Sequence, residues 1–221
     1  MRGFHLTAVP AAVLAVAVSV VLVAATPASA AVSLTHPQVV HAALTANDLG
    51  NGWHHVDVSG GGAGTPEAAE GCPGTGYTTT GIRYDVQRGF QFQTTPTIVH
   101  EEIESFRTVR AAKRDFRKGT AQFSSCTTFT MDGHQWNVNR LAVASYGDRS
   151  VLFRLAGTVT SGTTDVPLTM YLNAARYGHH EVITLTAVGG ATDATVEKRV
   201  RDTSVQINKL ATAKVRVKLG R

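Results

Sequence analysis

Two pairs of adjacent histidines are the residues whose chemistry most readily suggests a metal or catalytic site. His54 and His55 follow the turn-forming run LTANDLGNGW, and His179 and His180 form the second pair. Adjacent residues on a strand point to opposite faces, so neither pair can easily hold one ion together. A zinc site that joins one residue of the first pair to His134 and His179 is the alternative, but no His-Glu-x-x-His motif or cysteine cluster accompanies it. We therefore expect no metal and no cofactor.

Motifs for nucleophilic or phosphate chemistry are incomplete. The serines of SSC and RSV lack the Gly-x-Ser-x-Gly elbow, and the glycine-rich GCPGTGYTTT lacks the lysine that reaches a phosphate. Glu102 and Glu104 share one strand face and could do acid–base work, although carboxylates on a solvated strand are usually only solvated. We expect a protein that is not an enzyme, with a secreted hydrolase of dispersed catalytic residues as the alternative.

The first thirty residues indicate export. Arg2 supplies a positive start, AVPAAVLAVAVSVVLVAA an apolar stretch, and TPASAA a small-residue cleavage segment after Ala30. An uncleaved anchor is the alternative, because the apolar run approaches the roughly 18 to 20 residues that span a bilayer. Cleavage leaves 221 − 30 = 191 residues. We therefore expect a signal peptide over 1–30, a single domain over 31–221, no stable transmembrane anchor, and a secreted protein that could associate with the cell wall.

The two cysteines, Cys72 and Cys126, both lie in the exported part. An oxidising compartment favours a disulfide between them, with two free thiols as the alternative. A bond that closes a loop of 126 − 72 = 54 residues stabilises the fold by about 4 kcal/mol in the loop-entropy model. There is no Cys-x-x-Cys pair, so we expect no redox function.

The formal net charge of +5 includes Arg2, which leaves 5 − 1 = +4 for the mature chain. The excess is concentrated in VRAAKRDFRKG (109–119) and KLATAKVRVKLGR (209–221). Nucleic-acid binding normally needs a denser basic surface, so we expect no nucleic-acid partner. Anionic wall polymers or lipid head groups are reasonable partners for these segments, and plain solvated helix faces are the alternative.

The hydrophobic periodicity predicts an α+β fold, a mainly antiparallel sheet with helices packed on one face and one disulfide. Apolar residues recur at helical spacing in three segments and at alternate positions in two others, and short turns separate several β-like runs after Cys126. The predicted helices are 36–44, 109–126 and 192–213, the predicted strands are 81–93 and 97–106, and the later runs are TTFTM, QWNV, RLAVASY, RSVLFRLAGTVT, LTMYLNAARY and HEVITLTAV.

The alternation in the last three runs separates an apolar from a polar face. The apolar face, which we expect under the helices, carries Val151, Phe153, Leu155, Leu168, Met170, Leu172, Ile183 and Leu185. The opposite face offers a guanidinium, a phenol, an amide and a hydroxyl, which suit a sugar, phosphate or carboxylate ligand. Its candidate ligand-binding residues are Arg154, Tyr171, Asn173 and Thr184. Any antiparallel sheet with one wet face shows the same alternation, which is the alternative.

Several segments follow one familiar order: ALTANDLGNGW, a cysteine near a glycine-rich loop, VHEEIESFRTVRAAKRDF, a helix ending in SSC, YGDRSVLFRLAG, ARYGHHEVITLT and a final helix. In this order the chain resembles the actinobacterial PknH-like extracellular sensor domain family. The resemblance implies an antiparallel sheet with helices around a broad cleft that binds an envelope ligand. The chain departs from receptor-kinase members in having no kinase signature, no second transmembrane segment, and only one of the disulfides that some members carry.

The resemblance and the missing catalytic motifs together favour a secreted, non-enzymatic, sensor-like binding module. The expected ligand is an envelope glycan, lipid or peptide. A secreted hydrolase and a passive wall-associated structural protein are the alternatives.

Overall fold

The computed structural model describes residues 33–57, 80–94, 97–131, 133–161, 163–190 and 193–220. The segment Ala31–Arg221 forms one compact unit. The predicted signal peptide, 1–30, lies outside the described residues. Within the described residues, no helix is long and apolar enough to cross a membrane.

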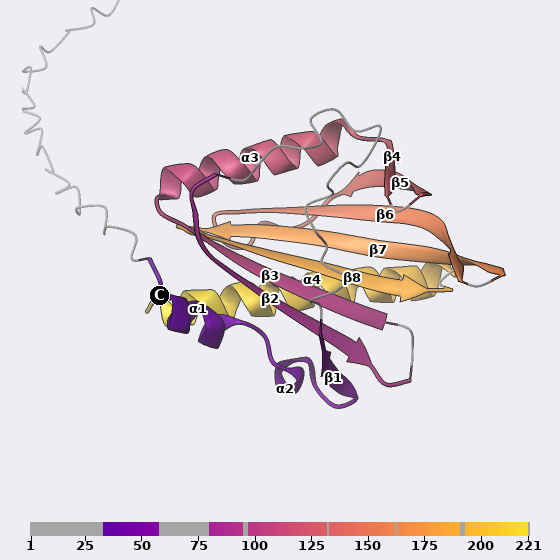
Figure 1. Cartoon of the computed structure of the whole chain (residues 1–221), viewed down its shortest axis with the longest axis horizontal. Coiled ribbons are helices and arrows are strands. Elements are labelled where there is room, and N and C mark those ends of the chain that lie inside the picture. The colour runs from indigo at the N-terminus through magenta and orange to yellow at the C-terminus, as the bar shows by residue number, and fades with distance from the viewer. Residues whose placement is uncertain are drawn as a thin grey trace, which may run out of the picture. The chain divides into compact units, whose positions relative to one another are not determined.

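Four helices and eight strands make up the described part of the chain (Figure 1). They are, in order, α1 (His36–Ala42), α2 (Ala46–Leu49), β1 (Trp53–Val56), β2 (Ile82–Phe92), β3 (Thr97–Phe106), α3 (Val109–Ser125), β4 (Thr128–Met131), β5 (His134–Leu141), β6 (Arg149–Ser161), β7 (Thr164–Tyr177), β8 (His180–Gly189) and α4 (Ala194–Lys218).

The strands form one sheet in the order β1-β2-β3-β8-β7-β6-β5-β4, and every pairing is antiparallel. The antiparallel α+β fold predicted from the sequence is therefore confirmed, and strands β4 to β8 form an antiparallel meander. The N-terminal strands join this meander through β3 and β8, where Glu104 lies opposite Glu181 in register.

The predicted strand RLAVASY is wrong. Its first two residues end β5, and the chain then runs without strand structure to Arg149. The Ser150 side chain holds this connection in place, since its hydroxyl accepts from the Tyr146 amide at 3.1 Å and donates to the Ala144 carbonyl at 3.4 Å. A side chain that bonds neighbouring backbone groups competes with strand pairing.

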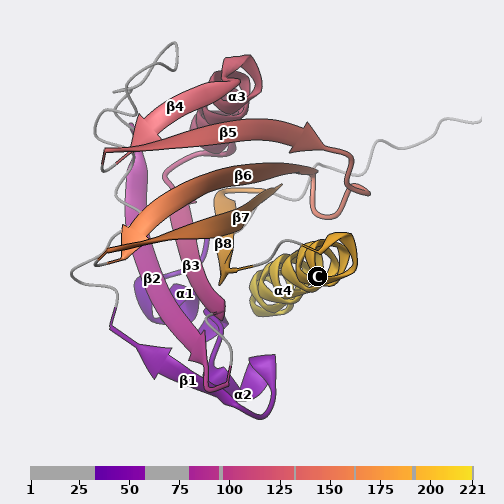
Figure 2. The same cartoon turned by 90° about the vertical axis from the view of Figure 1, so that its right-hand side faces the viewer.

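The helices cover both faces of the sheet, which corrects the prediction that they pack on one face. Phe153 and Arg154 are neighbours on β6 and so point to opposite faces. The Phe153 ring lies 5.5 Å from that of Phe123 in α3, whereas Arg154 forms an ion pair with Glu197 in α4. In both views β6 and β7 lie between α3 and α4 (Figures 1 and 2). The alternation identified two faces correctly, but a polar face can also be covered by a helix with polar inward residues.

Each face has its own hydrophobic core. Beneath α1 and α4 the buried residues include Leu34, Val39, Leu44, Val86, Phe90, Val99, Ile103, Val182, Ile207, Ala211 and Val215. Beneath α3 they include Phe116, Phe129, Trp136, Val138, Val151, Phe153, Leu155 and Met170. The second group contains the centre of the predicted apolar face, so the prediction that this face lies under a helix is confirmed there.

Cys126 caps the C-terminal end of α3 and is buried. No cysteine among the described residues is a free thiol. Its predicted partner, Cys72, lies outside the described residues. The Cys72–Cys126 bond therefore stays a prediction.

Candidate functional site

The four predicted ligand residues lie together on one face, but α4 covers them. Arg154 pairs with the Glu197 carboxylate, and the Tyr171 hydroxyl donates to the Glu197 backbone carbonyl at 3.2 Å. Glu197 lies in the first turn of α4. These two side chains therefore hold the start of α4 on the sheet.

Asn173 and Thr184 make the next contacts along α4, and both are fully buried. The Asn173 amide donates to the Ser204 hydroxyl at 2.5 Å, and the Asn208 amide donates to the Thr184 hydroxyl at 3.0 Å. Asn208 also donates to the Val182 carbonyl at 3.2 Å. Polar groups that already bond to a helix are not an open ligand surface, so we assign Asn173 and Thr184 to helix attachment.

The histidines of the two pairs lie in different surroundings. His54 and His55 are exposed on β1, and His180 is buried with its Nδ1 2.7 Å from the Ser105 hydroxyl. Burial lowers the pKa of His180 to about 4, so this ring is neutral at neutral pH. Among the described residues, no histidine belongs to a group of three or more His, Cys, Asp and Glu side chains with metal-ligand spacing.

A groove of about 600 Å³ lies between α4 and the segment of α2 and β1. Its apolar lining comes from Leu49, Trp53, Ile207 and Leu210. Trp53 packs edge-on against Phe92 with ring centroids 5.3 Å apart, which fixes the indole at the groove wall. This packing anchors the start of β1, and the place of Trp53 in the groove was not predicted.

Charged and amide side chains surround this apolar lining: Asp48, Lys198, Arg199, Asp202 and Gln206. Lys198 contacts Asp202 at 2.8 Å one helical turn away. The groove therefore combines an aromatic and aliphatic surface with polar groups on α4, a combination that suits a ligand with both apolar and polar parts.

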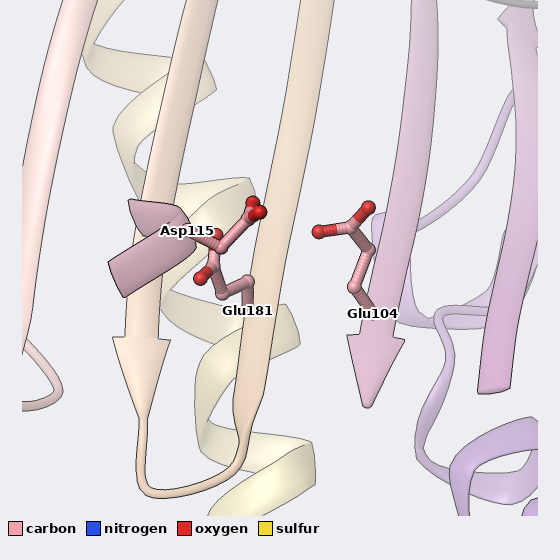
Figure 3. A group of neighbouring side chains, drawn as sticks. All are labelled: Glu104, Asp115 and Glu181. Atoms are coloured by element: carbon pink, nitrogen blue, oxygen red, sulfur yellow. The ribbon is translucent and has the colours of Figure 1, made fainter. Parts of the chain in front are cut away.

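A second group of side chains lies under α3. Glu104 from β3, Asp115 from α3 and Glu181 from β8 point toward one another (Figure 3). One carboxylate oxygen from each residue lies within 4.8 Å of those of the other two. Their exposed fractions are 7%, 7% and 3%. Three acidic groups are thus concentrated in a space where water does not screen them.

Burial and mutual repulsion disfavour the charged forms of these groups. Burial, together with the charges of Glu102, Asp115 and Asp85, raises the pKa of Glu104 to about 8. Burial and the charges of Glu104 and Asp115 raise the pKa of Glu181 to about 9, and a backbone amide and a nearby guanidinium offset only part of this rise. The group therefore either holds protons at neutral pH or requires a cation.

Sequence reasoning identified one of these three residues. The alternation in EEIE placed Glu104 on a strand face, whereas Asp115 lies among the cations of a basic helix, where no local pattern predicts a site. Glu181 follows the second histidine pair, and 181 − 104 = 77 residues separate it from its cross-strand partner. Only the pairing of β3 with β8 brings the two carboxylates together, and no local pattern predicts which strands pair.

The outward side of α3 has the opposite charge. Its exposed cations are Arg110, Lys113, Arg114, Arg117 and Lys118, at spacings of three and four residues that place them on one side of the helix. Within the described residues, none of them forms an ion pair. We call these five side chains the basic face of α3.

No protein-family model matches the chain, and no curated protein matches it. The structure is similar to the crystal structure of the extracellular domain of PknH from Mycobacterium tuberculosis, with a TM-score of 0.55 and 11% sequence identity. The match covers 84% of this chain and 98% of that chain. At this identity the similarity shows a shared fold, the one that the motif order suggested, and it assigns no residue a role.

Proposed function

We propose that the protein is an extracellular, non-enzymatic binding module whose ligand occupies the groove between α4 and the α2–β1 segment. The observation that carries this proposal is the groove itself, in which a fixed indole and aliphatic side chains lie beside charged groups on a helix. The fold shared with an extracellular domain and the signal-peptide pattern of residues 1–30 support its placement outside the cell.

The groove suits an amphiphilic envelope molecule, such as a glycan or lipid with charged substituents, or a peptide. An indole offers a flat apolar surface on which a sugar ring or acyl chain can lie. The Arg199 guanidinium can pair with a phosphate or carboxylate on the same ligand. Such a module would act by presenting or sensing its ligand, since the chain carries no catalytic motif that we recognise.

The basic face of α3 gives this module a second contact with the envelope. Its five cations, which have no ion-pair partner in the described residues, lie within about two and a half helical turns. Such a concentration of positive charge attracts a flexible polymer of phosphates or carboxylates. We propose that this face holds the protein near anionic wall polymers, while the groove binds the specific ligand.

The proposal is tested by a thermal-shift screen of purified envelope glycans, lipids and peptides. We expect a saturable rise in melting temperature for a member of one class. Leu210→Gln should weaken that binding, because Leu210 lines the groove and is 37% exposed. Val217→Gln, a matched change on the same helix outside the groove, should leave it unchanged.

Two outcomes would replace this function with another. Steady turnover of fluorogenic esters or peptides, lost on substitution of a residue in this chain, would favour a secreted hydrolase. If no ligand class changes the melting temperature and no substrate is turned over, a passive wall-associated structural role would be favoured instead.

A further inference from the structure

We propose that Glu104, Asp115 and Glu181 bind one hard divalent cation of the calcium type between α3 and the sheet. This site is separate from the groove, and the proposal does not depend on the groove's ligand. No sequence motif indicates such a site, because its three residues come from three different elements.

The geometry of the three carboxylates matches the size of such an ion. Calcium–oxygen distances are about 2.3–2.6 Å, so oxygens on opposite sides of one ion lie roughly 4.6–5.2 Å apart. The three carboxylate oxygens here all lie within 4.8 Å of one another. An ion placed among them can therefore reach all three with little movement of the side chains.

A second observation points to a missing ligand at this position. Glu181 is 3% exposed, and its Oε1 atom has no hydrogen-bond partner in the described part of the chain. Its carboxylate points into the group, beside that of Asp115 (Figure 3). A buried carboxylate oxygen without a partner is costly, and a bound cation would remove that cost.

The basic side chain opposite Glu181 is directed elsewhere. Arg176 faces Glu181 in the β7–β8 register, but its guanidinium contacts Asp148 at 2.8 Å and the Gly178 carbonyl at 3.4 Å. The cross-strand pair of Glu104 and Glu181 thus places two like charges directly opposite each other, which destabilises a sheet unless something lies between them.

The donor atoms select the class of ion. All three are carboxylate oxygens, which suit calcium, magnesium and manganese, whereas zinc and copper sites usually include imidazole or thiolate. Calcium tolerates irregular geometry and two-oxygen binding by one carboxylate, and magnesium requires a strict octahedron. Three carboxylates on two strands and a helix therefore favour calcium, and the bound ion would join α3 to β3 and β8.

The test is a calcium titration of the purified chain after treatment with a chelator, followed by calorimetry and melting temperature. We expect one ion per chain and a saturable rise in melting temperature. Glu181→Gln and Asp115→Asn should each weaken calcium binding by at least about tenfold. Removal of a residue that only hydrogen-bonds to a metal ligand already lowers metal affinity by about tenfold or more, and these two residues are proposed as direct ligands. Asp165→Asn, an equal charge change at an exposed position on β7, should bind calcium normally.

Two results would overturn the proposal. One is the absence of a saturable response of the native chain to calcium, magnesium or manganese at millimolar concentration. The other is a calcium response that is the same in native protein and in Glu181→Gln, which would place any bound ion elsewhere. If Glu181→Gln raises the melting temperature in chelator and no metal affects the native chain, the carboxyl groups are held together by shared protons instead. Circular dichroism of each variant in chelator establishes that it is folded before calcium is added.

Discussion

The two long helices attach to opposite faces of one sheet by different chemistry. Besides an apolar core, α4 has hydrogen bonds to the sheet that involve Asn173, Tyr171 and Asn208. Its outer cations are partly paired, as Lys198 is with Asp202. Beneath α3 the contacts are an aromatic core and three crowded carboxyl groups, and its outer cations have no ion-pair partner in the described residues. The attachment of α3 should therefore respond to metal ions, while that of α4 should respond to the loss of individual hydrogen bonds.

The largest expected effect comes from the aromatic core beneath α3. Phe153→Ala removes a side chain that is 1% exposed and packs against Phe123. We expect a loss of about 3–5 kcal/mol in the free energy of unfolding, as for other buried aromatic residues cut to alanine. Urea denaturation followed by fluorescence measures this loss. A loss near zero would mean that the face assigned to α3 is not packed as described.

The next effect concerns the polar attachment of α4. Asn208→Ala removes an amide that donates to the Thr184 hydroxyl and the Val182 carbonyl, and leaves these buried acceptors without that partner. We expect a loss of about 2–3 kcal/mol in the free energy of unfolding, within the range for a buried group that loses its hydrogen bond. The matched control is Gln206→Ala, at an exposed position on the same helix, for which the change should stay within about 0.5 kcal/mol. Equal losses in the two variants, measured by urea denaturation, would show that the buried amide does not hold α4.

A smaller effect, that of pH on stability, comes from a carboxyl group on the α4 side of the sheet. Glu101 lies on the α4 side, fully buried, and burial raises its pKa to about 7, partly offset by the Leu44 amide that donates to it at 2.8 Å. Lys214 and Arg88 also lower this pKa and Asp48 raises it. The folded protein holds the proton more tightly than the unfolded chain, so the stabilising contribution is complete below about pH 4 and is lost as the pH rises through about 7.

Glu101→Gln does not titrate and should therefore gain stability relative to the native protein as the pH rises from about 5 to about 8. Melting temperatures of both proteins across this range, in chelator and again in calcium, measure the difference. A constant difference at every pH would show that Glu101 keeps an ordinary pKa in the folded protein.

The smallest effect on stability is expected for the basic face of α3, where substitutions should instead have a large effect on the binding of anionic polymers. Lys113→Gln with Arg117→Gln should change the free energy of unfolding by less than about 0.5 kcal/mol each, because both side chains are exposed. The same pair of changes should weaken binding to inorganic polyphosphate and reduce the salt dependence of that binding by about one unit of slope per lost contact.

Lys198→Gln with Arg201→Gln on α4 is the matched control, since both cations already contact Asp202. Equal loss of polyphosphate binding in the two double variants would show that the cations of α3 bind anionic polymers no better than the paired cations of α4. Binding to anionic vesicles without binding to polyphosphate would identify a membrane surface as the partner of α3.

Sequence patterns predicted individual elements better than their arrangement. The bounds of β3 were predicted without error and those of α3 within one residue, because alternation and helical spacing are local properties. The polar face was also identified, but nothing near Arg154 and Asn173 in the chain shows that α4 returns to contact them. Their role as ligand residues stays a prediction. For the same reason, the sequence did not predict the group of carboxylates at Glu181, because strand pairing between distant segments determines which residues surround it.

The seam between β3 and β8 sets an order for folding. Strands β4 to β8 are joined by short turns and can pair as they are made. In contrast, Ser105 of β3 can pair only with His180 of β8, which follows it by 180 − 105 = 75 residues. Contacts between such distant residues form slowly, so we expect closure of this seam to follow formation of the meander. Until then β3 has an unpaired edge, and such edges readily pair with other chains. In a chain made from its N-terminus, the interval before β8 emerges is the period in which aggregation is most favoured.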